Sequence, residues 1–242
     1  MRAAVVVLLA TTCSDVLAYR PFDSTDAAVA DDGEFELELG PVGWLREGSK
    51  NLVVAPAVIA NIGLRGDLEL VLQGQREVLQ NPDPGEPRAS IVNTGVFIKH
   101  MLRNGTLQDQ PGPSIATEYG FLLPEVNGQS GTGFSVAGIV SQRWEPMTIS
   151  FNSAVSLTRS HHGDLFLGTI FEGRYEWPVR PVLEIFAEWE SSGPRTASVL
   201  VGAIWRVSKD LQIDFGVRGA NSSGEPIREI RLGFTWAFPW KS

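Results

Sequence analysis

The residues of this sequence best suited to nucleophilic or metal chemistry are three histidines and one cysteine. His161 and His162 are adjacent and Asp164 follows them, an arrangement that could transfer protons or bind a metal. A single turn does not aim three ligands at one tetrahedral ion, and no second acidic cluster is obvious in the sequence. We interpret this segment as a polar hairpin loop and predict no metal site, no cofactor and no catalytic residue. A membrane-embedded hydrolase that uses these histidines is the lesser alternative.

His100 and Cys13 complete this group. No serine motif surrounds His100, so we interpret it as an interfacial side chain rather than a catalytic base. Cys13 lies within Met1–Ala18, which has the pattern of a signal peptide, with a positive charge at Arg2 and a short apolar run after it. Cleavage at the end of this segment would export the chain and remove its only cysteine, which excludes a disulfide framework and a cysteine nucleophile.

Charged side chains form a second group, and they recur at every second position. Glu34–Leu39 alternates acid and hydrophobe without a break, and Gln212–Arg218 and Glu229–Phe238 repeat the pattern. Strict alternation places polar side chains on one face of a β-strand and apolar side chains on the other. In a membrane barrel the polar face lines the interior. The residues predicted to line it are Glu36, Glu38, Glu69, Lys99, Glu118, Asn152, Arg180, Glu184, Glu188, Arg206, Asp214, Arg218, Glu229 and Arg231.

Over the whole chain, this alternation predicts twelve strands. Their ranges are 34–46, 51–63, 66–80, 89–103, 114–126, 131–144, 147–159, 163–175, 179–190, 196–207, 210–221 and 226–238. Most are long enough for the ~9–11 tilted residues that cross a bilayer. An even number of hairpin-linked strands closes with both termini at one end and leaves no unpaired edge in lipid. The predicted fold class is all-β, a closed antiparallel transmembrane β-barrel of about twelve strands over residues 34–240.

Alternation alone does not separate a membrane barrel from a soluble, lipocalin-like one. The tryptophans favour the membrane, because each is predicted at or near a strand end or in an adjoining turn. There an indole ring lies in the apolar layer while its N–H reaches water. With a periplasmic N-terminus, five of the seven gather at the periplasmic rim and two at the outer rim. These residues are Trp44, Trp144, Trp177, Trp189, Trp205, Trp236 and Trp240.

The composition is compatible with one large domain. Hydrophobic residues make up 43% of the sequence, which is too many for a disordered chain. The formal net charge is −8, so the chain lacks the basic footprint of a nucleic-acid-binding protein. The mild acidic balance selects no partner by itself.

Five segments have a residue pattern that is typical of a protein family, and none of them is a catalytic motif. They are Tyr19–Asp23 with Thr25 and Asp26, Glu34–Pro41, Gly112–Glu118, Trp177–Pro181 and Val201–Trp205. In these segments the chain resembles outer-membrane β-barrel transporters related to the proteins named for the MetA pathway of phenol degradation. The resemblance covers most of the mature chain. It implies a single-chain barrel that passes small hydrophobic or aromatic compounds.

The mixed charge of the predicted interior allows two arrangements. Acids and bases could line a water-filled pore, or they could pair and pack a narrow barrel shut. The polar leader, residues 19–33, either folds into the barrel as a plug or stays in the periplasm. We predict an outer-membrane barrel that passes small molecules passively, with a non-conducting structural or surface-interaction barrel as the alternative. Its expected partners are outer-membrane lipid and the assembly machinery that reads a C-terminal aromatic residue such as Phe238.

Overall fold

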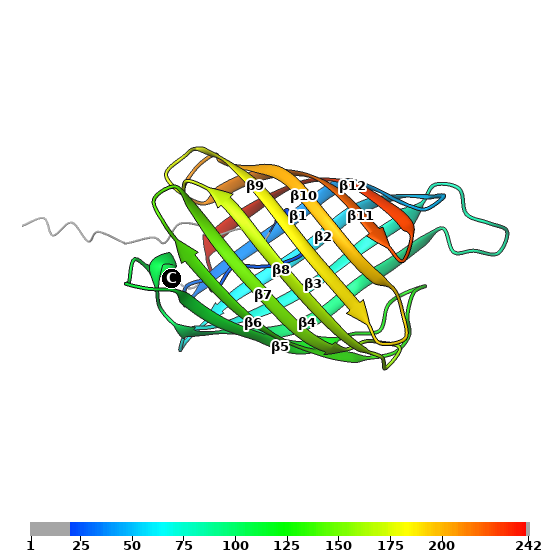
Figure 1. The fold of residues 1–242 in the computed structure, drawn as a ribbon, viewed down its shortest axis with the longest axis horizontal. Helices are drawn as coiled ribbons and strands as arrows, with labels where there is room; N and C mark the ends of the chain where they lie inside the picture. The colour runs from blue at the N-terminus through cyan, green and yellow to red at the C-terminus, as the bar shows by residue number, and fades with distance from the viewer. Residues whose placement is uncertain (1–19, 241–242) are drawn as a thin grey trace, which may run out of the picture.

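The computed structural model describes residues 20–240, which form a closed antiparallel barrel of twelve strands (Figure 1). The predicted signal peptide lies outside the described residues. The strands are β1 (Glu34–Glu47), β2 (Lys50–Leu64), β3 (Leu68–Leu79), β4 (Ala89–Arg103), β5 (Ser114–Leu122), β6 (Gly133–Arg143), β7 (Met147–Leu157), β8 (Gly163–Gly173), β9 (Val179–Glu190), β10 (Arg195–Arg206), β11 (Leu211–Ser222) and β12 (Glu225–Pro239). The predicted fold class is confirmed.

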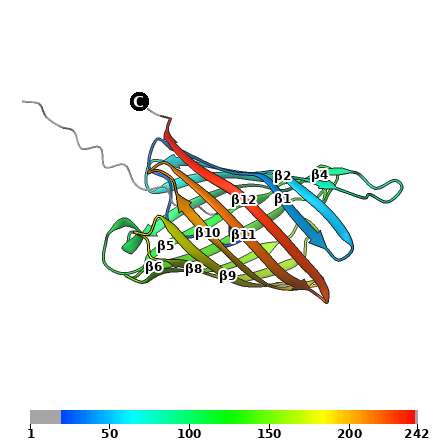
Figure 2. The same ribbon diagram turned by 90° about the horizontal axis from the view of Figure 1, so that it is seen from above.

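The barrel closes through β1 and β12, which pair from Glu34 opposite Pro239 to Glu47 opposite Ile227. Every other strand pairs with its neighbours in the sequence, so hairpins connect the whole wall (Figures 1 and 2). Because each strand has two partners, the sheet has no open edge whose amides would need water. Among residues 20–240, no helix is long and apolar enough to cross a membrane.

The two ends of the barrel differ. At one end, here called the terminal end, the N–H of Trp240 donates to the carbonyl oxygen of Gly33 at 2.8 Å. A short helix, η1 (Thr106–Gln108), lies at the same end between β4 and β5. The opposite end, here called the loop end, carries the β3–β4 connection, which projects furthest from the wall (Figures 1 and 2).

Side chains alternate between an apolar outer face and a polar inner face. Val155 and Val201 are 60% and 53% exposed on the outside, whereas Glu38, Lys99 and Glu184 are fully buried inside. A soluble barrel would have the reverse arrangement, since it buries its apolar face. The exposed apolar wall therefore indicates a barrel that is surrounded by lipid.

The tryptophans lie near the two ends of this apolar wall. Five are at the terminal end, namely Trp144, Trp177, Trp205, Trp236 and Trp240, and each is about half exposed. Trp44 and Trp189 lie toward the loop end, on β1 and β9. This distribution matches the two aromatic girdles that mark the bilayer interfaces of membrane barrels.

Two bulges, each of which contains a proline, change the alternation within β1 and β2. Pro41 lies in a bulge of β1 between Leu39 and Val42, and Pro56 lies in a bulge of β2 between Val54 and Ala57. A bulge adds one residue and reverses the faces beyond it. Proline suits such positions because it has no N–H for the ladder. Beyond the bulges Leu45 and Val54 point into the lumen, where strict alternation from Leu39 or Val58 would place them outside.

Candidate functional site: the barrel lumen

The lumen is lined by the polar faces of all twelve strands. The fourteen residues predicted to line it all have inward side chains: eight are buried or half-buried toward the terminal half, and six face an open chamber in the loop half. The eight are Glu36, Glu38, Glu69, Lys99, Arg180, Glu184, Arg206 and Asp214, and the six are Glu118, Asn152, Glu188, Arg218, Glu229 and Arg231.

The segment before β1 runs inside the barrel along this polar wall. We call residues 20–33 the leader. Its successive contacts fall on β12 and β11, then β9, then β7, β6, β3 and β2, so that it circles the inner wall before it enters β1. The leader has no strand partner of its own, and its backbone donors need acceptors from the wall.

Lumenal carboxylates accept backbone hydrogen bonds from the leader. The Glu184 carboxylate accepts from the N–H of Ser24 at 2.6 Å and from the N–H of Asp23 at 3.0 Å. Glu38 accepts from the N–H of Arg20 at 3.0 Å, and Glu69 accepts from the N–H of Ala30 at 2.6 Å. The buried acids of the wall therefore hold the leader through its backbone N–H groups.

Uncharged side chains on β6 and β7 hold the middle of the leader. The Asn152 amide bonds the backbone of Thr25 in both directions, accepting from its N–H at 3.0 Å and donating to its carbonyl at 2.6 Å. The hydroxyl of Ser141 accepts from the N–H of Ala27 at 2.9 Å. A buried backbone amide without such a partner would cost ~1–3 kcal/mol, so each bond favours the inward path.

Charged side chains add a second set of contacts. Arg231 donates to the carbonyl of Pro21 at 2.6 Å and to the Asp23 carboxylate at 3.0 Å. Burial would raise the pKa of the Asp23 carboxyl, but the guanidinium groups of Arg231 and Arg218 hold that pKa below its usual value. On the opposite wall, Lys99 Nζ lies 3.8 Å from the Asp26 carboxylate. The leader is thus bound by ion pairs on both sides of the lumen.

Small and apolar residues fit the leader against the wall. Phe22 packs against Val182, Leu200 and Ile204. Ala27 and Ala28 belong to a buried cluster on the other side, with Leu107, Ala116 and Ile139. A Cβ atom at Gly168 would overlap the Ser24 hydroxyl, and one at Gly63 would overlap the carbonyl of Asp31. These glycines leave the room that the leader occupies.

Above the leader, toward the loop end, the lumen opens into a chamber of about 740 Å³. Its two sides differ in chemistry. Leu45, Val54, Ile59 and Phe97 face it from β1, β2 and β4. Charged groups face it from β9, β11 and β12, including Glu188, Arg218, Glu229 and Arg231, and Glu47 and Glu77 face it beside the apolar residues. A molecule with an apolar body and a polar group would find a matching side for each part.

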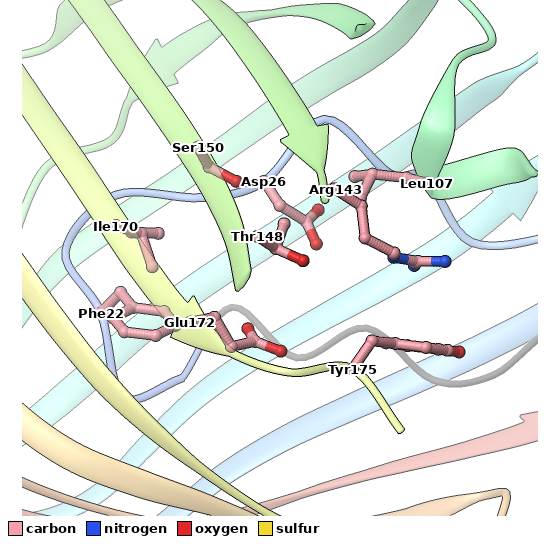
Figure 3. Close-up of a pocket in the computed structure, with 9 residues that line it drawn as sticks. All are labelled: Phe22, Asp26, Leu107, Arg143, Thr148, Ser150, Ile170, Glu172 and Tyr175. Atoms are coloured by element: carbon pink, nitrogen blue, oxygen red, sulfur yellow. The ribbon is translucent and has the colours of Figure 1, made fainter. Parts of the chain in front are cut away.

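Below the leader, toward the terminal end, the space is much smaller. A pocket of about 20 Å³ lies between the leader residues Phe22 and Asp26 and the wall residues Thr148, Glu172 and Tyr175 (Figure 3). The guanidinium of Arg143 lies 3.8 Å from the centre of the Tyr175 ring, and that of Arg206 lies 4.5 Å from it. Such a pocket has room for about one water molecule. The leader and the side chains around this pocket therefore leave little free space between them.

The histidine segment lies at the loop-end rim of the chamber, which Asp164 and Glu190 also line. His161 occupies the β7–β8 turn at the loop end with a φ of 61°, and His162 Nδ1 lies 2.8 Å from the Glu190 carboxylate. Asp164 accepts a long hydrogen bond from Ser156 at 3.4 Å. Within residues 20–240, no group of three or more possible metal ligands comes together. His162 and Asp164 therefore have separate partners.

Sequence reasoning did not find the leader-holding role of Ser141, nor the apolar side of the chamber. Ser141 carries no signal of its own, because its partner is a backbone amide more than a hundred residues away. The inward positions of Leu45 and Val54 follow from the bulges, and Pro41 and Pro56 were the available sign of them.

Solved structures share this fold, although no family model matches the sequence and no curated protein is similar to it. An outer membrane channel from Pseudomonas putida F1 has a TM-score of 0.65 at 8% identity, over 90% of this chain and 100% of that one. The KdgM porin has a TM-score of 0.53 at 11% identity, over 84% of this chain and 99% of its own. At such identities the likeness shows the fold, which is that of outer-membrane barrels.

Proposed function

We propose that this chain is an outer-membrane channel through which small molecules diffuse passively, and that the leader forms its constriction. The observation that carries this proposal is the chamber of about 740 Å³, which is enclosed by a polar inner wall within an apolar outer wall. A polar lumen inside a lipid-facing barrel is the arrangement of porins. The fold shared with an outer membrane channel and with a porin supports the same function.

The location follows from the same features. Met1–Ala18 acts as the signal peptide that exports the chain, and the barrel inserts with its terminal end toward the periplasm. The chamber then opens toward the cell exterior, and the leader lies on its periplasmic side. Molecules that enter from outside would meet the chamber first and the leader second.

The permeants are small molecules with an apolar or aromatic body. The support for this finer proposal is the apolar side of the chamber, where Leu45, Val54, Ile59 and Phe97 gather. Apolar surface offers such a molecule ~25 cal/mol for each Å² removed from water. The charged side across the chamber would bind a hydroxyl or carboxylate group on the same molecule.

A non-conducting barrel is the second candidate. The observation that favours it is the dense network around the leader, beside which lies a pocket of only about 20 Å³. In that case the leader would be a permanent filling, and the barrel would serve as a component of the envelope.

Liposome swelling separates the two candidates. The mature barrel is refolded into liposomes, and its insertion is established by heat-modifiable gel mobility. We expect swelling in small solutes such as benzoate and little swelling in oligosaccharides, because the leader limits the lumen. Absence of swelling in every solute, from a barrel that is verifiably inserted, would favour the non-conducting candidate.

A further inference from the structure

The lipid-facing wall carries a hollow on the side formed by β7 to β12. Its volume is about 810 Å³. Small residues on neighbouring strands create it, since Ala187 is opposite Ala197 and Val199 is opposite Gly219. Large apolar side chains border it, namely Phe151, Leu167, Phe171, Ile185 and Trp189. A flexible hydrocarbon chain fits a hollow of this size and chemistry.

Two arginines with no acidic partner lie at the loop-end edge of this hollow. Arg228 lines the hollow, and Arg46 is directly opposite Arg228 in the register of β1 and β12. Both side chains are exposed. Within residues 20–240, neither guanidinium forms a salt bridge, although Nε of Arg46 donates to the carbonyl of Gly48 at 3.2 Å. Like charges directly opposite one another destabilise a strand pair, and an anion between them would remove the repulsion.

These arginines lie at the height where a lipid head group meets its acyl chains. Trp44 is two residues before Arg46 on the same face of β1, and Trp189 on β9 is opposite a third exposed arginine, Arg195. Tryptophan marks the membrane interface. The three guanidinium groups therefore lie at the head-group layer, with the apolar hollow directly below them.

We propose that this hollow binds one anionic lipid of the surrounding membrane. Its acyl chain lies along Ala197 and Gly219, and its phosphate lies between Arg46 and Arg228. The positive charge at the edge selects an anionic head group. The space left by the small residues of the hollow accommodates the acyl chain. This inference rests on the proposed membrane location but not on conduction through the lumen.

Native mass spectrometry of the refolded full barrel tests the head-group selection. Phosphatidylglycerol and phosphatidylcholine with identical acyl chains are added in equal amounts. We expect the wild type to retain phosphatidylglycerol preferentially, and R46Q/R228Q to lose this preference by about fivefold for each arginine. Arg88→Gln, an exposed loop-end arginine in the β3–β4 connection that does not line the hollow, is the matched control and keeps the preference.

Gly219→Leu tests the hollow independently of charge. A Cβ atom at Gly219 would meet no atom within 4 Å, so the larger side chain fills the hollow without disturbing the wall. We expect retention of both lipids to fall while the arginines stay intact. Equal retention of the two lipids by the wild type, or binding of inorganic phosphate alone as tightly as lipid, would overturn the proposal. If the refolded wild-type barrel selects the anionic lipid but conducts no ions, only the proposed channel function is contradicted.

Discussion

The two halves of the lumen are lined by the same kinds of polar side chain, yet one half is filled and the other is open. In the terminal half, Glu38, Glu69 and Glu184 accept backbone hydrogen bonds from the leader. In the loop half, Glu188 and Glu229 face a chamber of about 740 Å³. The wall alone therefore does not decide how open the barrel is. The two halves differ because the leader occupies only the terminal half, where its backbone N–H groups donate to the carboxylates of the wall.

The largest effect is expected from Glu184→Ala, which would make the filled half resemble the open one. This carboxylate accepts bonds from the backbone of two leader residues, Asp23 and Ser24. A hydrogen bond contributes ~0.5–1.5 kcal/mol, and a buried N–H that loses its acceptor costs ~1–3 kcal/mol. We expect the leader to become at least about tenfold more susceptible to limited proteolysis while the barrel stays intact.

Glu188→Ala is the matched control for this variant. Glu188 lies four residues further along the same face of β9, and within the described residues it makes no hydrogen bond to the leader. Leader cleavage in Glu188→Ala should equal that of the wild type. Equal cleavage in both variants and the wild type would mean that Glu184 does not hold the leader.

The open half should respond to side-chain volume inside the lumen but not outside it. Ala154 lines the chamber from β7, and the next residue, Val155, faces outward. We expect Ala154→Trp to lower single-channel conductance about twofold, because the indole narrows the aqueous path. Val155→Trp should leave conductance unchanged. A response to both variants or to neither would place the conducting path elsewhere.

A smaller effect concerns ion selectivity in the open half. Eight carboxylates line the chamber (Asp23, Glu47, Glu77, Glu118, Asp164, Glu188, Glu190 and Glu229) against four arginines (Arg20, Arg159, Arg218 and Arg231). Excess acid favours cations. The reversal potential in a KCl gradient should indicate cation preference, and Arg218→Gln should increase it by a few millivolts. Arg46→Gln on the outer wall is the control without effect, and anion preference in the wild type would contradict this electrostatic reading.

The smallest effect is expected at the loop-end histidines. His162 pairs with Glu190 in a partly exposed position, where such pairs contribute ~0–1 kcal/mol. H161A/H162A should therefore retain wild-type conductance and heat-modifiable mobility. Loss of a measurable esterase or protease activity in this variant would revive the hydrolase alternative.

The barrel wall could be predicted from the sequence because each strand carries its own signal. The predicted ranges 89–103 and 179–190 agree with β4 and β9 at both ends. The predicted range 114–126 is too long, since β5 ends at Leu122 just before Pro124. Alternation also fails beyond Pro41 and Pro56, because a bulge shifts the pairing without changing the hydrophobic pattern.

The path of the leader could not be predicted in the same way. Residues 20–33 have no strand period, and their partners are single side chains such as Glu184 and Asn152, spread over strands far apart in the sequence. Such long-range contacts leave no local pattern. The sequence therefore left the plug and the periplasmic leader as equal alternatives, and the open chamber could not be located.

The most direct test of the comparison is the single-channel conductance of the mature barrel in planar bilayers, measured with and without residues 20–32. Insertion of both forms is established beforehand by heat-modifiable mobility. We expect a small, steady and ohmic conductance from the complete chain, and a conductance several-fold larger when the leader is removed. Equal conductance of the two forms, or silence from both, would contradict the view that the leader sets the width of an otherwise open lumen.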